Sequence, residues 1–147
     1  MDFYTLNAKE TLSLPQNADH PVILTLLRNY TLGVEWQVSH GAADCCICLG
    51  NAVPVARGDA AFVLNVTPDG AYIEGRDYNS TVNGFVTLLE KIFCYDKGVY
   101  RAACGIFRES PALGFRAAHF CVFPETSWDF LRKCVLTCAV MRYSHVI

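Results

Sequence analysis

Hydrophobic side chains recur every three to four residues in three stretches of the chain, which is the spacing of a helix with one buried face. The first predicted helix covers about 20–32. Asp19 offers it an N-cap, Pro21 suits its first turn, and Gly33 can end it. The apolar face of this helix carries Val22, Ile23, Leu26, Leu27 and Tyr30.

Two further helices are predicted in the second half of the chain. Asp77 or Asn79 can cap a helix at about 79–93, which has the clearest amphipathic pattern in the sequence. Its apolar stripe consists of Val82, Phe85, Val86, Leu89 and Ile92. The segment Pro124-Glu-Thr-Ser127 indicates the start of a third helix, which covers Trp128–Tyr143.

Strands are predicted where hydrophobic and polar residues alternate, or where a short run is apolar on both faces. Val34, Trp36 and Val38 alternate with polar neighbours, which indicates a half-buried strand. The run from Asp44 to Leu49 is apolar on both faces and is typical of a strand between two covering layers. Further strands are predicted at Thr11–Leu14, Val99–Phe107, Gly114–Phe123 and Ser144–Ile147.

A hairpin is predicted where Ala61–Val66 and Ala71–Gly75 flank the turn sequence Thr67-Pro-Asp-Gly70. These two strands should be antiparallel neighbours. Taken with the alternating pattern that begins at Val34, they predict an α+β fold in which residues 34–76 form antiparallel strands. The helices at about 20–32 and 79–93 should cover one face of that sheet.

Composition narrows the class of protein. The chain has 147 residues, so it lacks the roughly 250 residues of a complete (β/α)8 barrel. With 52% hydrophobic and 18% charged residues it should form a packed core. The net charge of −2 and the lack of a Lys/Arg cluster argue against nucleic acid as a partner. No apolar run approaches a membrane span and the amino terminus lacks signal-peptide features, so we expect a cytoplasmic protein that does not bind membranes.

The eight cysteines lie within hydrophobic runs, so we expect reduced, buried thiols rather than a disulfide framework. Zinc sites place cysteine pairs on turns, whereas these cysteines fall in a predicted strand and along a predicted helix: Cys45, Cys46, Cys48, Cys134 and Cys138. The four histidines are isolated and none is followed by Glu, which excludes His-Glu-x-x-His. The sequence therefore predicts no metal site and no cofactor.

Two segments together resemble a known enzyme family. Ala61–Gly75, followed by Asn83-Gly-Phe-Val-Thr-Leu-Leu-Glu90, resembles the hairpin and the Gly-x-x-Thr-Leu helix that close the non-catalytic domain of family 20 β-N-acetylhexosaminidases. Glu109-Ser-Pro-Ala-Leu-Gly-Phe-Arg-Ala-Ala-His-Phe120 resembles the Asp-Ser-Pro-x-x-x-x-Arg-Gly segment that leads into the first barrel strand of the same enzymes. Pro124–Tyr143 then matches the first barrel helix, and Ser144–Ile147 the start of the second strand.

The resemblance implies two parts. Residues 1–110 would form the accessory α/β domain of a hexosaminidase, often grouped as zincin-like, with a mixed, largely antiparallel sheet and two helices on one face. Residues 111–147 would be the truncated start of the TIM-barrel catalytic domain. The parent protein would be a glycoside hydrolase of carbohydrate metabolism.

The resemblance also implies where the chemistry lies. In this family an adjacent Asp-Glu pair works with the substrate's own acetamido group. The fourteen acidic residues of this chain include no adjacent pair, so we expect no catalytic residue here. Arg116 and His119 are the candidates for substrate binding. The family usually has Asp-x-x-Arg after the first barrel strand, but this chain has Cys121-Val-Phe-Pro124, which puts the substrate in doubt.

The expected partner is the rest of the catalytic barrel in the parent enzyme. Without it, the apolar side chains of residues 112–147 should pack back on the first domain or mediate self-association. The alternative reading is a stand-alone carbohydrate- or protein-binding module, in which aromatic side chains bind sugar. Trp36, Tyr72, Phe85 and Trp128 are the aromatic residues considered for that role, although the first three fall at core-facing positions.

Overall fold

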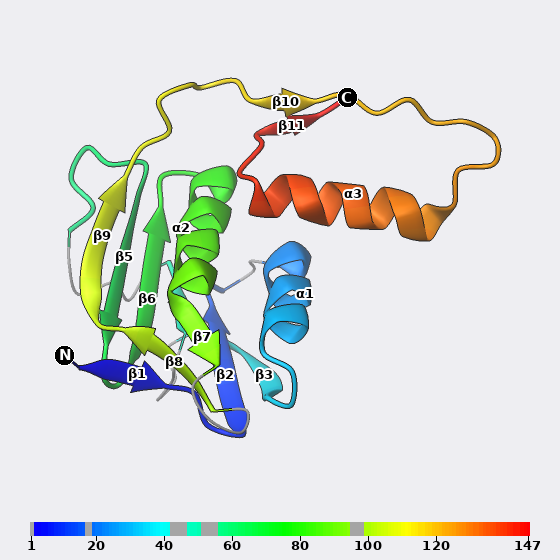
Figure 1. Cartoon of the computed structure of the whole chain (residues 1–147). Coiled ribbons are helices and arrows are strands. Elements are labelled where there is room, and N and C mark those ends of the chain that lie inside the picture. Colours follow the sequence, from blue (N-terminus) through cyan, green and yellow to red (C-terminus); the bar gives the residue numbers. More distant parts are fainter. Residues whose placement is uncertain (1, 17–18, 42–46, 51–55, 95–98) are drawn as a thin grey trace.

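A six-stranded sheet forms the larger part of the structure, a computed structural model that describes residues 2–16, 19–41, 47–50, 56–94 and 99–147 (Figure 1). Its strands lie in the spatial order β3 (Glu35–His40), β2 (Lys9–Leu14), β4 (Ile47–Leu49), β6 (Gly70–Gly75), β5 (Phe62–Thr67) and β9 (Gly105–Glu109). The fold is α+β and the sheet is mixed.

The strand directions correct the prediction of a largely antiparallel sheet. β2 pairs in parallel with both β3 and β4, and β4 pairs in parallel with β6. Only β5 runs against its two neighbours, β6 and β9. The prediction was wrong for residues 34–49 because β2 lies between the two strands assumed to be neighbours, and a helix connects β2 to β3 as a parallel crossover.

The predicted hairpin is confirmed. Val66 lies opposite Ala71 and Thr67 opposite Gly70, so the chain reverses at Pro68-Asp69. β5 is buried on both faces, since Phe62 to Val66 are all buried. This burial follows from its central position, since β5 has a hydrogen-bonded neighbour on each side.

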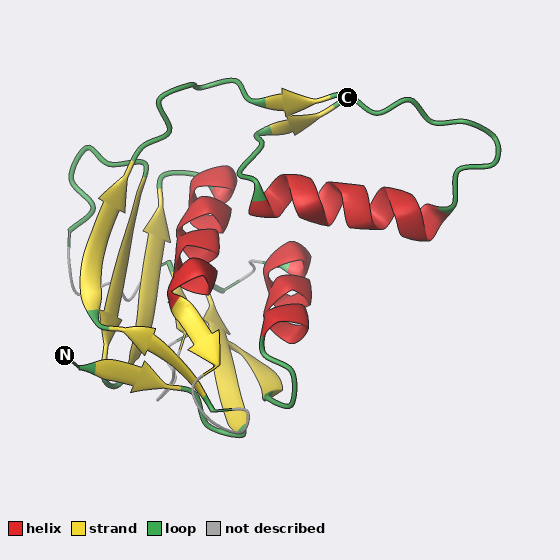
Figure 2. Ribbon diagram, viewed as in Figure 1, coloured by secondary structure: helices red, strands yellow, loops and turns green. Residues whose placement is uncertain are grey.

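Two helices cover one face of this sheet, as predicted: α1 (Pro21–Tyr30) and α2 (Tyr78–Lys91) (Figure 2). The N-cap of α2 is Asp77, whose Oδ1 accepts a hydrogen bond of 2.8 Å from the backbone N–H of Ser80. The N-cap of α1 is His20 rather than the predicted Asp19, and its side chain makes no capping hydrogen bond.

A glycine sets the distance between α2 and the sheet. A Cβ added at Gly84 would lie 2.8 Å from Ile73 Cγ2 and 2.9 Å from Phe62 Cδ2, both closer than real carbon contacts. Ile73 and Phe62 belong to the hairpin and are buried at 0% and 1% exposure. The glycine of the Gly-x-x-Thr-Leu segment is therefore required for close packing of helix on hairpin.

A second, three-stranded sheet lies beside the first: β1 (Phe3–Thr5), β8 (Tyr100–Ala103) and β7 (Ile92–Cys94), in the order β1-β8-β7. The predicted strand Val99–Phe107 is divided between the two sheets, because β8 pairs with β1 and β9 pairs with β5. Between them the backbone N–H of Cys104 donates to the carbonyl of Asp2, 3.0 Å away.

The helix α2 ends at Lys91, two residues before the predicted end at Phe93.

The last part of the chain is a parallel β-α-β unit made of β10 (Ala117–Ala118), α3 (Trp128–Val140) and β11 (His145–Val146). α3 lies across the amino-terminal ends of α1 and α2 (Figure 1). The predicted strand Gly114–Phe123 is only two residues long, because β10 has a single neighbouring strand in the described part of the chain. No helix in the described ranges is long and apolar enough to cross a membrane.

Candidate functional site

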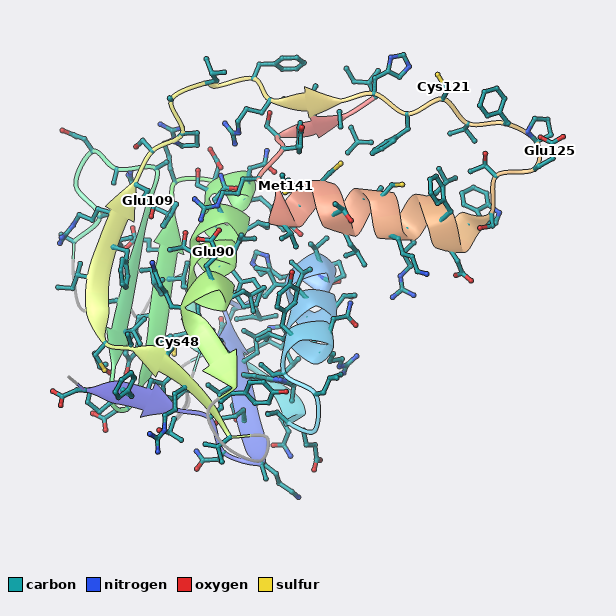
Figure 3. The ribbon with its side chains drawn as sticks, in the orientation of Figure 1. Cys48, Glu90, Glu109, Cys121, Glu125 and Met141 are labelled. Carbon is teal, nitrogen blue, oxygen red and sulfur yellow. The ribbon has the colours of Figure 1, made fainter. Side chains whose placement is uncertain are left out.

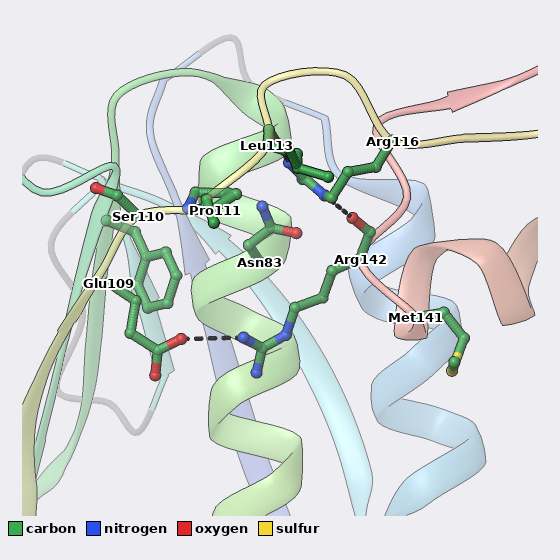
Figure 4. A pocket seen from close by; sticks show the side chains of 10 residues that line it. Asn83, Glu109, Ser110, Pro111, Leu113, Arg116, Met141 and Arg142 are labelled. Carbon is green, nitrogen blue, oxygen red and sulfur yellow. Dashed lines mark hydrogen bonds and ion pairs between the residues drawn. The ribbon is translucent and has the colours of Figure 1, made fainter.

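A pocket of about 370 Å³ lies where the six-stranded sheet meets the β-α-β unit (Figure 4). We call it the junction pocket. Phe62 and Asn83 line it from the sheet and from α2. Glu109 lines it from the end of β9, and the connection that follows contributes Ser110 to Leu113 and Arg116. Met141 and Arg142, which directly follow α3, complete the lining.

Arg142 holds this junction together. Its Nη1 lies 3.0 Å from Glu109 Oε2, and its Nη2 lies 2.7 Å from Glu90 Oε2 and 3.1 Å from Thr87 Oγ1. Charge-assisted hydrogen bonds of this kind are stronger than neutral ones. One guanidinium therefore joins the end of α3 to both α2 and β9. Figure 3 shows Glu90 and Glu109 on these two elements, beside the end of α3.

The backbone at Arg142 is unusual, since its φ of 59° lies in the left-handed region that favours glycine. It directly follows Met141, the C-cap of α3, where a left-handed residue commonly ends a helix. Here the residue is an arginine, whose side chain is then aimed at the two carboxylates.

The structure places the candidate residue Arg116 at the edge of the junction pocket. Its Nε donates to the carbonyl of Arg142 at 2.7 Å, and its Nη1 donates to the carbonyl of Leu113. Its backbone N–H donates to Ser144 Oγ at 2.9 Å, and its carbonyl accepts from the N–H of Ser144 at 2.7 Å. Arg116 thus ties the connection before β10 to the residues that follow α3.

The other candidate, His119, lies apart from Arg116. It is exposed and follows the carboxyl end of β10, whereas Arg116 precedes the same strand. The N–H of Ile147 donates to Ala118 and its carbonyl accepts from the N–H of Phe120, both at 2.8 Å, so His119 sits where β10 and the chain after β11 are still paired. In α/β barrels the carboxyl ends of the strands carry the active site.

Arg142 was not identified from the sequence. Its partners belong to the two segments that carry the family resemblance, because Thr87 and Glu90 lie in the helix segment and Glu109 begins the second segment. Hydrophobic periodicity does not indicate that Arg142 bonds to residues of both segments. Only the tertiary structure brings Arg142 and the two segments together.

The cysteines do not form a metal site in the part of the chain that the structure describes, where no cluster of three His, Cys, Asp or Glu residues could hold an ion. Cys45 and Cys46 lie outside the described residues. Cys138 is buried, which raises its pKa above the usual value, and the neighbouring Cys134 adds to the rise. Cys48 is buried as expected, but Cys121 is exposed on the connection between β10 and α3, so the expectation of buried thiols is wrong for Cys121 (Figure 3).

The aromatic residues divide into core and surface. Trp36 is 7% exposed, and its Nε1 donates to Thr31 Oγ1 at 2.8 Å. Phe85 is fully buried. Both are core residues, as their core-facing positions predicted, whereas Tyr72 is only half-buried. Trp128, at the start of α3, is 85% exposed and borders a largely apolar groove between α1 and α3.

No protein-family model and no curated protein matches the chain, but solved structures do. The family 20 β-N-acetylhexosaminidase from Streptomyces coelicolor matches with a TM-score of 0.74 at 15% identity, over 99% of this chain and 31% of its own. The family 20 exo-β-N-acetylglucosaminidase from Vibrio harveyi, in complex with N-acetylglucosamine, has a TM-score of 0.74 at 13% identity, over 99% and 23%. A β-N-acetylhexosaminidase from Bacteroides fragilis matches with a TM-score of 0.72 at 11% identity, over 99% of this chain and 29% of its own.

These matches confirm, at the level of the fold, the predicted resemblance to family 20 β-N-acetylhexosaminidases. The likeness covers both the six-stranded sheet and the β-α-β unit, since 99% of the chain is matched in each case. The chain spans less than a third of each of these structures.

Proposed function

We propose that this chain is the non-catalytic part of a family 20-type β-N-acetylhexosaminidase, with residues 1–110 as the zincin-like accessory domain and 111–147 as the first β-α unit of the catalytic barrel. The observation that carries the proposal is that one superposition on the Streptomyces coelicolor enzyme, with a TM-score of 0.74, covers 99% of the chain and therefore includes both parts. The order of the two sequence segments supports the same assignment.

The catalytic Asp-Glu pair would lie beyond Ile147, in barrel strands that this chain does not include. The chain's fourteen acidic residues contain no adjacent pair. Its own contribution would be to support the barrel. Arg142 fixes the β-α-β unit against α2 and β9, and Arg116 bonds in turn to the carbonyl of Arg142, which would set the direction in which further β-α units continue.

The remaining barrel would be the main partner of the β-α-β unit. Most of the exposed large hydrophobic side chains of the described residues lie between residues 112 and 147: Leu113, Phe115, Val122, Phe123, Trp128, Phe130, Val135, Met141, Tyr143, Val146 and Ile147. Monomers rarely leave so large an apolar surface in water. Barrel strands beside β10 and β11, and helices beside α3, would cover it.

The substrate-binding role of His119 follows from the same proposal, because His119 lies at the carboxyl end of the first barrel strand. Arg116 lies at the amino-terminal end of the same strand, β10, and would position that strand. The segment Cys121–Pro124 holds no arginine, so the parent enzyme would bind its sugar without the contact that the family usually makes there.

The test is the gene sequence that follows the codon of Ile147. The proposal predicts an open reading frame that continues through further β-α units and contains an adjacent Asp-Glu pair. A stop codon directly after Ile147 contradicts the proposal and favours a stand-alone module.

One observation favours that second function. Trp128 exposes 85% of its surface beside an apolar groove, and sugars stack on exposed aromatic faces. A carbohydrate-binding module would show saturable quenching of tryptophan fluorescence by N-acetylglucosamine oligomers. Because Trp36 is buried, Trp128→Phe should abolish that signal if Trp128 is the platform.

A further inference from the structure

Asn83 presents its side-chain carboxamide to the junction pocket, and no hydrogen bond joins this amide to another of the described residues. The residue is only 5% exposed. Its backbone carbonyl accepts from Thr87 Oγ1 at 3.1 Å, but the side-chain amide makes no such contact. Figure 4 shows this amide between Pro111 and Arg142, with the pocket around it.

A carboxamide offers two N–H donors and one carbonyl acceptor. The amide atoms of Asn83 are not among the buried, unpaired polar atoms of the described residues, so water in the pocket can reach them. A ligand that pairs with the amide would take the place of this water.

The other walls of the pocket limit the charge of such a ligand. Glu109 would repel an anion, and Arg116 and Arg142 would repel a cation. Arg142 is already paired with Glu109 and Glu90. Arg116 donates from Nε and Nη1 to backbone carbonyls. A neutral molecule avoids both repulsions.

The remaining surface is suited to an apolar group. Phe62, Pro111, Leu113 and Met141 supply hydrocarbon walls. Ser110 Oγ accepts from the N–H of Ala61 at 2.9 Å, which leaves its hydroxyl hydrogen free to donate. Small-molecule sites are commonly mostly apolar, contain a few polar groups, and lie where two units meet.

We propose that the junction pocket binds a small neutral ligand that carries an amide group next to an apolar group. The ligand amide pairs with the Asn83 carboxamide, and the apolar group lies against Leu113 and Met141. This inference is independent of the proposed glycosidase parent, because it uses only groups that line the pocket in this chain.

The test is an NMR titration of the full 147-residue chain with two probes of equal length, hexanamide and hexanoate. Hexanamide should shift the backbone signals of Asn83, Ser110 and Leu113 and saturate with a Kd of about 1–10 mM, as expected for a ligand of so few atoms. Hexanoate should bind at least tenfold more weakly. Equal or tighter binding of hexanoate, or no saturable shift with hexanamide, overturns the proposal.

Two variants test the role of the amide itself. Asn83→Leu should lose at least tenfold in hexanamide affinity, while its melting temperature in the free state equals that of the original chain. Asn79→Leu, the same substitution on an exposed residue of α2, is the control and should bind hexanamide normally. Undiminished binding by Asn83→Leu contradicts the proposal, as does a chain that melts lower or fails to fold, since the amide would then be needed by the fold.

Leu113→Trp provides a separate check from the rim of the pocket. Leu113 is 67% exposed, so the larger side chain should be tolerated by the fold and should fill the pocket. It should abolish the hexanamide shifts at Asn83. Unchanged shifts in this variant place the probe elsewhere and overturn the proposal.

Discussion

Thr87 and Arg142 are 55 residues apart in the sequence, and the Arg142 Nη2 donates a hydrogen bond of 3.1 Å to the Thr87 hydroxyl. Thr87 is buried within α2, and its hydroxyl also donates to the carbonyl of Asn83. Thr87, the threonine of the Gly-x-x-Thr-Leu segment, thus holds the side chain of Arg142, and Arg142 in turn holds the β-α-β unit against α2.

Arg142→Ala should release the β-α-β unit from α2 and β9. Because the arginine and both carboxylates are partly exposed, we expect a loss of about 1–2 kcal/mol in the free energy of unfolding. Hydrogen exchange should quicken in residues 112–147 more than in the six-stranded sheet. Arg132→Ala, on an exposed part of α3, is the matched control, and equal effects of the two substitutions would contradict the anchoring role.

Gly84→Ala should destabilise the chain even though alanine favours a helix by about 1 kcal/mol over glycine. The added Cβ would lie 2.8 Å from Ile73 Cγ2, so the helix must move away from the hairpin. Overpacking of this kind costs about 1–3 kcal/mol. Gly114→Ala meets nothing within 4 Å and should be neutral in the same urea-unfolding experiment. A Gly84→Ala variant as stable as the original chain would show that the contact is not tight.

His20 should make stability depend on pH. Burial lowers the pKa of His20 below its ordinary value, and the nearby Asp19 carboxylate opposes the shift in part. The ring stacks on Tyr78 with centroids 5.1 Å apart. Since the folded state then binds the proton less readily than the unfolded state, His20 contributes stability above the histidine pKa of the unfolded chain, and this is lost as pH falls.

The corresponding measurement compares the original chain with His20→Phe, which keeps an aromatic ring against Tyr78 but cannot titrate. Urea unfolding at pH 7.5 and pH 5.5 should show that the original chain loses stability relative to the variant at the lower pH. A difference that is the same at both pH values argues against a titrating His20.

The apolar surface of the β-α-β unit should drive self-association of the isolated chain. Light scattering over a range of concentrations should show species larger than the monomer, and a chain that ends at Pro111 should stay folded and be more monodisperse. Trp128→Ser should reduce the association of the full chain, because Trp128 is the most exposed of these side chains at 85%. A strictly monomeric full chain at all concentrations would be inconsistent with this expectation.

Local features of the fold could be predicted from the sequence because they depend on neighbouring residues. The hairpin at Thr67-Pro-Asp-Gly70 and the start of α3 at Ser127 follow from short-range chemistry, as does the N-cap of α2, for which the sequence offered Asp77 or Asn79. The packing of α1 and α2 on one face of the six-stranded sheet could be predicted because each helix has an apolar stripe. The family resemblance then correctly indicated the fold that the solved structures share.

Features that depend on distant pairing could not be predicted. Alternation shows that a strand is half-buried but not which strand lies next to it, so the insertion of β2 between β3 and β4 was missed. The division of Val99–Phe107 at Cys104 was missed because β8 pairs with β1 and β9 pairs with β5, a choice that depends on strands distant in the sequence. In the candidate site, Arg116 was identified by its segment, whereas Arg142 and Asn83 matter only because the chain folds them against the same pocket.

An activity assay tests the proposal that this chain is the non-catalytic part of a hexosaminidase. The purified chain is incubated with a chromogenic N-acetylglucosaminide, beside the longer protein that the proposal predicts from the same gene. We expect release of the chromophore by the longer protein and none above buffer by the 147-residue chain. Reproducible turnover by the chain alone, lost on substitution of one of its own residues such as His119→Ala, would contradict the proposal.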